Sequence, residues 1–512
     1  MLSQFKRKVK PQKSTKVKVK MLEKNQELKL LDLKKCGSVA DIVRGMNQCS
    51  FGARMLGEVT AKISQWLTEE NTPIAVYDGN LGSPIGQLLE EMVQRKWLSK
   101  VVSQHQYSFT SITPDNVIII GAYLESFELL LSQQKKEFIF INQFGMALPS
   151  QISDGYFPNV VFCDPHFVIP VLFTTLEETL NGKKTQVYQF IQQLSQYGGL
   201  ASDISKGANT LLTMVEEFEC KVFLTLSGAM TIAKMGLIIC DMIDFGMVNA
   251  ICSTGALMAH GLVESVGLKH FKYDPNEDDA NLAQQKLNRV TDTLEPEMNL
   301  EHISKTITQI FAQYNVQEAL SSKKFHEKIG EYLSLRYPNE KGILKSAYEQ
   351  KIPIFVPAFH DSELGNDVCL DNYLRKTKGI QPITFNLELD TEYLLDIVTN
   401  SSKIGIFTIG GGVPRNYIQN LPPLIELINE GTRANLPEKK FSYGCRICPD
   451  PMYYGHLSGC TYSEGMSWRK MELNGCFSEI RADATQILPF LVKFVMEAQE
   501  QKFHQKIKPG EN

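Results

Sequence analysis

The stretch Thr408-Ile409-Gly410-Gly411-Gly412-Val413-Pro414-Arg415-Asn416 is the strongest clue to the fold of this chain. It follows an apolar run, Ile404 to Ile409, that has the character of a buried strand. Three glycines after a strand leave a turn without side chains, so a ligand can approach the backbone closely. Such a turn suits a nucleotide phosphate or a flat cofactor ring, but it also suits a plain tight turn. Because the spacing matches neither a dinucleotide fingerprint nor a phosphate loop, this stretch alone leaves both interpretations open.

Length and charge narrow the class of protein. A chain of 512 residues exceeds the usual size of one domain and predicts two or three. The net charge of -4 favours neither nucleic acid nor a membrane as a partner. Residues 5–20 carry eight Lys or Arg and no acid, and residues 1–38 are expected to be a basic, disordered tail. The most apolar candidate for a membrane span, Val222 to Cys240, is interrupted by Lys234, so we expect none.

The eleven cysteines are scattered along the chain without a disulfide framework. Cys445 and Cys448 form a C-x-x-C pair, but Cys460 and Cys476 do not complete the spacing of a zinc ribbon. We therefore expect reduced thiols, no metal site and a cytoplasmic location.

Apolar periodicity predicts an α/β protein with a doubly wound, mainly parallel sheet and an additional N-terminal α/β region. Residues 39–71 are expected to form a helical segment, with one apolar stripe from Val39 to Glu70. In residues 72–195 strands alternate with helices, and this region is interpreted as either inserted or duplicated. The predicted strands there are 73–77, 117–122, 137–142 and 159–163.

A second alternation fills residues 196–512, which we expect to be the ligand-binding domain. Its expected helices include 203–219 and 484–501, and its expected strands are 221–226, 248–252, 352–356, 404–409 and 442–447. The turn at 227–229 is expected to open a helix. The polar stretch 274–301 is expected to be a surface loop.

Three of these strands end in turns of small residues: Ser227-Gly-Ala-Met230, Ser253-Thr-Gly-Ala256 and Gly410-Gly-Gly412. In an open parallel sheet the carboxyl ends of the strands line the ligand crevice. Each turn alone is compatible with a tight junction between strand and helix. Together they predict a Rossmann-like dinucleotide site.

Several segments occur in the order found in a known family. LTLSGAMTIAKMG, STGALMAHGLVES, PIFVPAFHDSELG, TIGGGVPRN and SEGMSWRK resemble the deoxyhypusine synthase family, particularly its bacterial and archaeal members. The resemblance covers roughly residues 220–500, and the run Ser50 to Gly57 is similar to the family's N-terminal helix.

The resemblance implies a transferase that oxidises spermidine with NAD and releases 1,3-diaminopropane. The aminobutyl group then passes through an imine on a lysine to an acceptor amine. In eukaryotes and archaea the acceptor is one lysine of a translation factor, whereas some bacterial relatives use a free diamine and make homospermidine. The resemblance also implies a homotetramer with active sites shared across a dimer interface.

Three catalytic positions follow from the resemblance. Lys470 matches the catalytic lysine, Trp468 supplies an apolar wall for a polyamine chain, and Asn416 stands where the eukaryotic pattern has a histidine as proton acceptor. Imine formation needs a neutral amine, so we expect burial or a neighbouring positive charge, such as Arg469, to depress the pKa of Lys470.

The resemblance assigns contacts with NAD to Ser227, Gly228, Ala229, Thr254, Gly255, Ala256, Asp361, Gly410, Gly411, Gly412, Asp483 and Ala484. Asp483 precedes a predicted helix, so a plain N-cap is the alternative interpretation of that residue.

The sequence departs from the family at the polyamine site. Family acids fall here at His260, Tyr454 and Leu457, and Asn366 replaces another aspartate beside Asp367. We expect His260, His456 and Glu464 to contact substrate in their place. Because Asn416 cannot act as a general base near neutral pH, two alternatives stay open: transfer to a free diamine, and a non-catalytic protein that binds NAD or polyamine.

Overall fold

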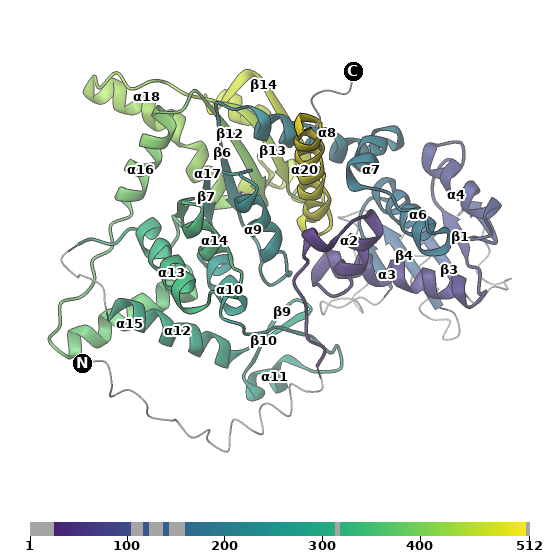
Figure 1. Cartoon of the computed structure of the whole chain (residues 1–512), viewed down its shortest axis with the longest axis horizontal. Coiled ribbons are helices and arrows are strands. Elements are labelled where there is room, and N and C mark those ends of the chain that lie inside the picture. Colours follow the sequence, from purple (N-terminus) through teal and green to yellow (C-terminus); the bar gives the residue numbers. More distant parts are fainter. Residues whose placement is uncertain (1–24, 104–115, 122–136, 143–158, 313–317, 508–512) are drawn as a thin grey trace.

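The computed structural model describes residues 25–103, 116–121, 137–142, 159–312 and 318–507. The basic run at 5–20 lies outside these ranges. The prediction of a disordered tail is wrong for residues 25–38, because Leu28, Leu31 and Leu33 are buried in the core. The described strands form a six-stranded sheet, a five-stranded sheet and a small three-stranded sheet. The six-stranded and five-stranded sheets lie on either side of the long helix α20 (Ala484–Ile507) in Figure 1.

The six-stranded sheet is parallel throughout and has the strand order β11-β7-β6-β12-β13-β14. Its strands in chain order are β6 (Cys220–Leu226), β7 (Ala250–Ser253), β11 (Ile354–Phe355), β12 (Lys403–Ile409), β13 (Phe441–Ile447) and β14 (Met471–Ile480). The chain runs outward from β6 to one edge and then returns to the centre at β12. The order therefore reverses between β6 and β12, and ligands bind at such a switch point in open α/β sheets.

Both faces of this sheet are covered, which explains why β12 is buried from Ile404 to Ile409. Ile404 and Ile406 face one buried cluster, whereas Phe407 and Ile409 face another. The first cluster is completed by helices α16 (Glu388–Thr399), α17 (Gly412–Gln419) and α18 (Leu421–Thr432). The second face packs against α8 (Gly199–Glu216) and α20. The mainly parallel α/β architecture predicted from the sequence is confirmed.

The five-stranded sheet is also parallel, with the order β2-β1-β3-β4-β5. Its strands are β1 (Ile74–Tyr77), β2 (Lys100–Ser103), β3 (Asn116–Ile120), β4 (Glu137–Asn142) and β5 (Val160–Phe162). Helices α3 (Phe51–Thr68), α4 (Pro84–Gln94) and α6 (Pro165–Asn181) pack against it. The start of α4 is fixed locally, because the Ser83 side chain accepts a hydrogen bond from Gly86 N and Pro84 occupies the first turn.

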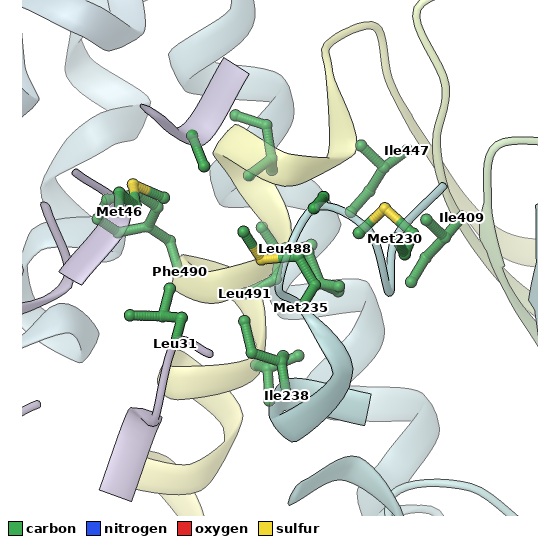
Figure 2. Close-up of a cluster of buried hydrophobic side chains, with 14 of the residues drawn as sticks. Leu31, Met46, Met230, Met235, Ile238, Ile409, Ile447, Leu488, Phe490 and Leu491 are labelled. Carbon is green, nitrogen blue, oxygen red and sulfur yellow. The ribbon is translucent and has the colours of Figure 1, made fainter. Parts of the chain in front are cut away.

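The two large sheets share one continuous core rather than two separate ones. One buried cluster contains Ile118 and Ile139 of the five-stranded sheet together with Leu224 and Ile447 of the six-stranded sheet. Figure 2 shows residues of α20 at the centre of this core: Leu488, Phe490 and Leu491 lie among Leu31, Met46, Met235 and Ile238. The domain boundaries proposed from the sequence at 39, 72 and 196 stay predictions.

The segment from Val39 to Glu70 is helical as predicted, and the structure divides it into two helices, α2 (Val39–Met46) and α3. The chain turns at residues 47–50, and Phe51 has a φ of 59°. A Cβ at Gly57 would lie 2.4 Å from the backbone N of Asn47, so the close approach of the two segments requires glycine.

Three further expectations differ from the structure. Residues 274–301 are not a surface loop, because they contain α11 (Asp279–Gln285), β9 (Leu287–Val290), β10 (Thr293–Pro296) and the start of α12 (Glu297–Phe311). The turn at 227–229 does not open a helix directly, since α9 begins only at Gly236. Strand β14 was not predicted, because this edge strand lacks an apolar run and its side chains are only partly buried.

The remaining elements flank these sheets. They are α7 (Val187–Leu194), α9 (Gly236–Asp244), α10 (Gly255–Ser265), β8 (Phe271–Lys272), α13 (Ser322–Arg336), α14 (Ile343–Glu349), α15 (Glu363–Thr377) and α19 (Tyr462–Ser467). Within the described ranges, no helix has the length and apolar character that a membrane crossing requires. All eleven cysteines are free thiols.

Candidate active site

The three small-residue turns meet at the carboxyl edge of the six-stranded sheet. Ser227 N donates to Ile409 O at 3.0 Å, which ties the end of β6 to the end of β12. Thr254 N donates to Leu226 O at 3.2 Å, and Gly410 N donates to Ile447 O at 2.8 Å. The turns are therefore fixed relative to one another by the strand ladder itself.

A cavity of about 380 Å³, here called the glycine cleft, opens over these turns. It lies at the switch point between β6 and β12, where the strand order places a ligand crevice. Its lining residues are Ser227, Thr254, Gly255, Ala358, Asp361, Gly410, Gly411, Gly412, Val413, Pro414, Cys448, Pro449, Asp450 and Ser458.

Glycine is required at this edge for space as well as for conformation. A Cβ at Gly411 would lie 2.6 Å from the Cα of Ser458, and one at Gly255 would lie 2.5 Å from the Cβ of Ser362. Gly410 has a φ of 80°, a region that favours glycine. The Ser227 hydroxyl accepts a hydrogen bond from Gly411 N at 2.8 Å and so holds the triple-glycine turn in place.

Two helices begin at the glycine cleft without a side-chain cap. The N-cap of α10 is Thr254 and that of α17 is Gly411, and neither residue provides a side-chain hydrogen bond to its helix. The first N–H groups of a helix then have no intrahelical acceptor, and the helix dipole adds positive potential. The cleft is thus suited to an anionic group such as a phosphate.

A second cavity, of about 390 Å³, adjoins the first and is here called the lysine cavity. Gly412 lines both cavities; Val413 and Pro414 then face the glycine cleft, and later residues of α17 face the lysine cavity. The lining residues of the lysine cavity are Gly412, Arg415, Asn416, Gln419, Asn420, Leu457, Cys460, Thr461, Glu464, Gly465, Trp468 and Lys470.

Lys470 is held inside this cavity by the two other predicted catalytic residues. Its Nζ donates to Asn416 Oδ1 at 3.1 Å and lies 5.6 Å from the centroid of the Trp468 ring. Burial lowers the pKa of Lys470 below its ordinary value, and the positive charge of Arg415 lowers it further. The amine is therefore biased towards the neutral, nucleophilic form.

The sequence suggested that Arg469 supplies the positive charge beside Lys470. In the structure this charge comes from Arg415. Arg469 is largely exposed and its Nε pairs with Glu426 Oε2 at 3.2 Å. Arg415 is buried, donates to Cys460 O at 2.6 Å and lies over the Tyr462 ring at 5.3 Å. Burial lowers the pKa of Arg415 from its ordinary value, but arginine keeps its charge near neutral pH.

His260 lies in a buried ionic network rather than in either cavity. Its Nδ1 is 2.6 Å from Glu295 Oε2, and its Nε2 is 3.8 Å from Glu363 Oε1. The network continues through His270, whose Nε2 is 3.5 Å from Glu295 Oε1, to Lys234. Burial favours neutral His260, but the hydrogen bond and charge of Glu295 outweigh it and raise the pKa of the imidazole.

The pKa of Glu295 shifts in the opposite direction from that of His260. Burial alone would raise its pKa, but hydrogen bonds and charges from His260 and His270 lower that pKa to about 2. The predicted contact of His260 with substrate stays a prediction, and its carboxylate partners come from within the chain.

The other predicted site residues are placed as follows. Glu464 lines the lysine cavity, whereas exposed His456 lies outside it, with Nδ1 3.9 Å from Asp450 Oδ2. Gly228, Ala229 and Ala256 belong to the turns but do not line the glycine cleft.

Asp483 and Ala484 also lie outside the glycine cleft, at the start of α20. Asp483 Oδ1 accepts from Thr485 N at 2.7 Å, which is the N-cap geometry weighed as the alternative. Its pKa is raised because the side chain is buried against Gly52 of α3. A contact of Asp483 or Ala484 with NAD stays a prediction.

Three lining residues were not predicted from the sequence. Arg415 lines the lysine cavity, and Asp450 and Ser458 line the glycine cleft. Arg415 was quoted within the glycine stretch, yet its burial depends on Cys460 and Tyr462, which are distant in sequence. The Ser458 hydroxyl donates to Asp450 Oδ2, and this contact depends on a loop whose path the sequence does not predict.

The fold and the site define a parallel α/β protein with a lysine cavity beside a glycine-lined cleft. The deoxyhypusine synthase family model matches residues 189–495. A protein named "Probable deoxyhypusine synthase 2" from Archaeoglobus fulgidus is 31% identical over 290 residues, which are 57% of this chain and 91% of that protein. A "Deoxyhypusine synthase-like protein" from Chlorobaculum parvum is 28% identical over 313 residues, 61% of this chain and 86% of that protein.

The chain therefore belongs to the deoxyhypusine synthase family. The family match includes the six-stranded sheet and both cavities, whereas the five-stranded sheet precedes it.

Proposed function

We propose that this protein is an NAD-dependent transferase that moves the aminobutyl group of spermidine, or of a related polyamine, through an imine on Lys470 to an acceptor amine. The observation that carries the proposal is Lys470 itself, a partly buried lysine with a lowered pKa in a cavity that adjoins the glycine cleft. Family membership supports the same reaction class.

The residues of the glycine cleft fit NAD. The uncapped starts of α10 and α17 offer backbone N–H groups to the pyrophosphate, and glycine at 255 and 411 leaves room for it. Asp361 lines the same cleft and supplies a carboxylate that can accept from ribose hydroxyls. When bound, NAD would accept a hydride from the substrate carbon and later return it.

The protein's own residues then perform the transfer. Neutral Lys470 attacks the oxidised carbon and forms an imine, and the amine leaving group departs as 1,3-diaminopropane when spermidine is the donor. Asn416 holds the Lys470 amine at 3.1 Å through its side-chain oxygen, so it orients the nucleophile without removing a proton. Trp468 lies beside the amine and presents a flat surface to the alkyl chain.

The acceptor amine can come from a free diamine or from a protein lysine. Glu464 is the only acid among the described residues that line the lysine cavity. One carboxylate can pair with one ammonium group of a short diamine. We propose a homotetramer, as the resemblance implies for the family, and a cytoplasmic location, as the scattered cysteines suggest.

Product analysis by mass spectrometry tests the proposal. The full-length protein is incubated with NAD, spermidine and isotope-labelled putrescine. The expected products are 1,3-diaminopropane and labelled homospermidine, with no net change in NADH absorbance because the cofactor is recycled. A protein-lysine acceptor predicts diaminopropane only when that protein is added.

A non-catalytic protein is the second candidate, and the loss of the family's histidine at Asn416 favours it. Bound NAD without any product from a panel of polyamines would establish that alternative and reject turnover.

A further inference from the structure

One short segment contributes to the walls of both cavities at the proposed site. Residues 458–461 form this segment, which is here called the shared wall. Ser458 lines the glycine cleft, whereas Cys460 and Thr461 line the lysine cavity. The triple-glycine turn packs against the shared wall, since a Cβ at Gly411 would lie 2.6 Å from Ser458 Cα. The shared wall is not a strand of the sheet, so its position depends on the side chains that reach its backbone.

A buried ion pair on two neighbouring strands reaches the shared wall. Arg446 of β13 and Glu479 of β14 are partners in the register of these parallel strands, so their side chains point to the same face of the sheet. Arg446 Nη2 lies 3.2 Å from Glu479 Oε2, and the arginine is 2% exposed. A buried pair of charges is costly to desolvate, and this cost is offset only when further hydrogen bonds satisfy the remaining atoms.

Those further hydrogen bonds join the ion pair to the backbone at both ends of the shared wall. Arg446 Nη1 donates to Ser458 O at 2.8 Å and to Cys460 O at 2.5 Å. Glu479 Oε1 accepts from Tyr462 N at 2.7 Å, directly after the shared wall. The ion pair thus holds three backbone groups between Ser458 and Tyr462.

The restraint on Tyr462 extends to the proposed catalytic residues. Tyr462 is the first residue of α19, and Trp468 and Lys470 follow the end of that helix. Lys470 N donates to Gly465 O of α19 at 3.0 Å. A displacement of the start of α19 would therefore move Lys470 relative to the glycine cleft.

Arg446 differs from Arg415, which also donates to Cys460 O. Arg415 lines the lysine cavity, and its charge lowers the pKa of Lys470. Arg446 and Glu479 are not among the described residues that line either cavity. They act through the shared wall and not by contact with substrate or cofactor.

We propose that Arg446 and Glu479 are positioning residues, which fix the distance between a cofactor in the glycine cleft and the Lys470 amine. The inference rests on the proposed function, in which the substrate carbon that gives a hydride to NAD is the carbon that Lys470 attacks. Both steps need one placement of this carbon relative to two groups, and a displacement of about 1 Å costs roughly 100-fold in rate.

Arg446→Lys tests this role, because lysine keeps the charge opposite Glu479 but loses the planar fork that reaches two carbonyl groups and a carboxylate. We expect kcat for release of 1,3-diaminopropane from spermidine to fall by about 10-fold to 100-fold. The KM for spermidine and the affinity for NADH should change by less than about 3-fold, since every lining residue is retained. The pH profile of adduct formation on Lys470 should not shift, because Arg415 and Asn416 remain beside the amine.

Arg375→Lys is the matched control. The Arg375 side chain is also largely buried, with Nε 2.5 Å from Asp371 Oδ2 and Nη2 donating to Phe311 O at 3.0 Å. Arg375 is not among the described residues that line either cavity. This variant should lose a similar amount of stability in urea unfolding and keep the parental kcat.

A second variant decides if Arg446→Lys does not fold. Arg446→Met combined with Glu479→Gln removes both charges at once and leaves neither unpaired. Glutamine keeps an oxygen for Tyr462 N, whereas methionine removes the donors to Ser458 O and Cys460 O. The same fall in kcat is therefore expected.

Parental kcat in Arg446→Lys, or an equal loss of kcat in Arg375→Lys, would overturn the positioning role and leave the proposed function intact. A loss confined to NADH affinity or to KM would overturn the positioning role as well. A parent protein that forms no adduct with spermidine would instead reject the proposed function, and the positioning role with it.

Discussion

The chain contains two parallel sheets of similar size, and within the described residues the open glycine turns belong to the six-stranded sheet. In the five-stranded sheet, β1 is followed by Asp78 and Gly79, and the Tyr77 ring fills the space that a Cβ at Gly79 would need, at 2.2 Å. In the six-stranded sheet, Gly410 to Gly412 line a cavity, and no atom lies within 4 Å of a Cβ built at Gly412. The turns after β3 and β4 lie mostly outside the described residues, so this comparison concerns the turns after β1 and β12.

The difference indicates that a parallel sheet alone does not make a ligand site. The six-stranded sheet adds two uncapped helix starts and a lysine beyond its switch point. In contrast, α4 of the five-stranded sheet begins with a filled cap, since Ser83 accepts from Gly86 N. We therefore expect substitutions at the end of β12 to affect chemistry and those at the end of β1 to leave it unchanged.

The largest effect is expected for Lys470→Ala, because the substitution removes the group that carries the imine. Turnover of polyamine should fall by about 10³-fold or more, as when other covalent nucleophiles are removed. Asp78→Ala at the end of β1 is the matched control and should retain parental turnover. Turnover is measured by mass spectrometry of the products. Comparable losses of turnover in the two variants would show that the effect is not specific to the six-stranded sheet.

Glu295→Gln tests the ionic network around His260 and should lower the free energy of unfolding by about 3 kcal/mol, as expected when one member of a buried ion pair is removed. The lowered pKa of Glu295, about 2, stabilises the fold above the ordinary Glu pKa, and this stabilisation is lost as pH falls towards 2. The raised pKa of His260 stabilises the fold below the ordinary His pKa and is lost as pH rises through the raised value.

Both contributions are present near pH 6, so urea unfolding at that pH is the measurement. Unchanged stability of Glu295→Gln at pH 6 would show that the ionic network around His260 does not stabilise the fold.

Gly411→Ala should weaken NAD binding by about 10-fold or more, because the new Cβ would lie 2.6 Å from Ser458 Cα and displace a wall of the cleft. Gly431→Ala is the matched control, since no atom lies within 4 Å of a Cβ at that exposed position on α18. Fluorescence titration with NADH compares the two. If the variants bind equally, the glycine cleft is not the cofactor site.

The smallest effect is expected for Asn416→Asp. A carboxylate in place of the amide oxygen, which lies 3.1 Å from Lys470 Nζ, favours the ammonium form and raises the pKa of that lysine. The pH profile of imine formation should therefore shift to higher pH, with a several-fold loss of rate near neutral pH. An unshifted profile would show that residue 416 does not affect the pKa of Lys470.

Much of the fold could be predicted from the sequence, because buried parallel strands such as β6 and β12 are continuous apolar runs. Strands without an apolar run were not predicted. Polar residues and a glycine interrupt the apolar residues of β14, and β9 and β10 lie in a charged stretch. The break between α2 and α3 was not predicted either, because both helices continue one apolar stripe. The close contact of Gly57 with Asn47 depends on the three-dimensional fold.

The candidate site could be predicted where residues are adjacent in sequence to a strand end. Ser227, Thr254, Gly255 and Gly410 to Gly412 follow strands directly, and the structure brings them to one cleft. Arg415, Ser458 and the carboxylate partners of His260 depend on contacts between distant segments, which one sequence does not reveal.

Borohydride trapping shows directly whether Lys470 carries the aminobutyl group. The protein is incubated with NAD and spermidine, treated with borohydride and digested, and the modified lysine is identified by mass spectrometry. We predict an aminobutyl adduct on Lys470, present in the control variant Lys221→Ala at the amino end of β6 and absent from Lys470→Ala. An adduct on another lysine, or equal trapping in Lys470→Ala, would show that Lys470 does not carry the imine.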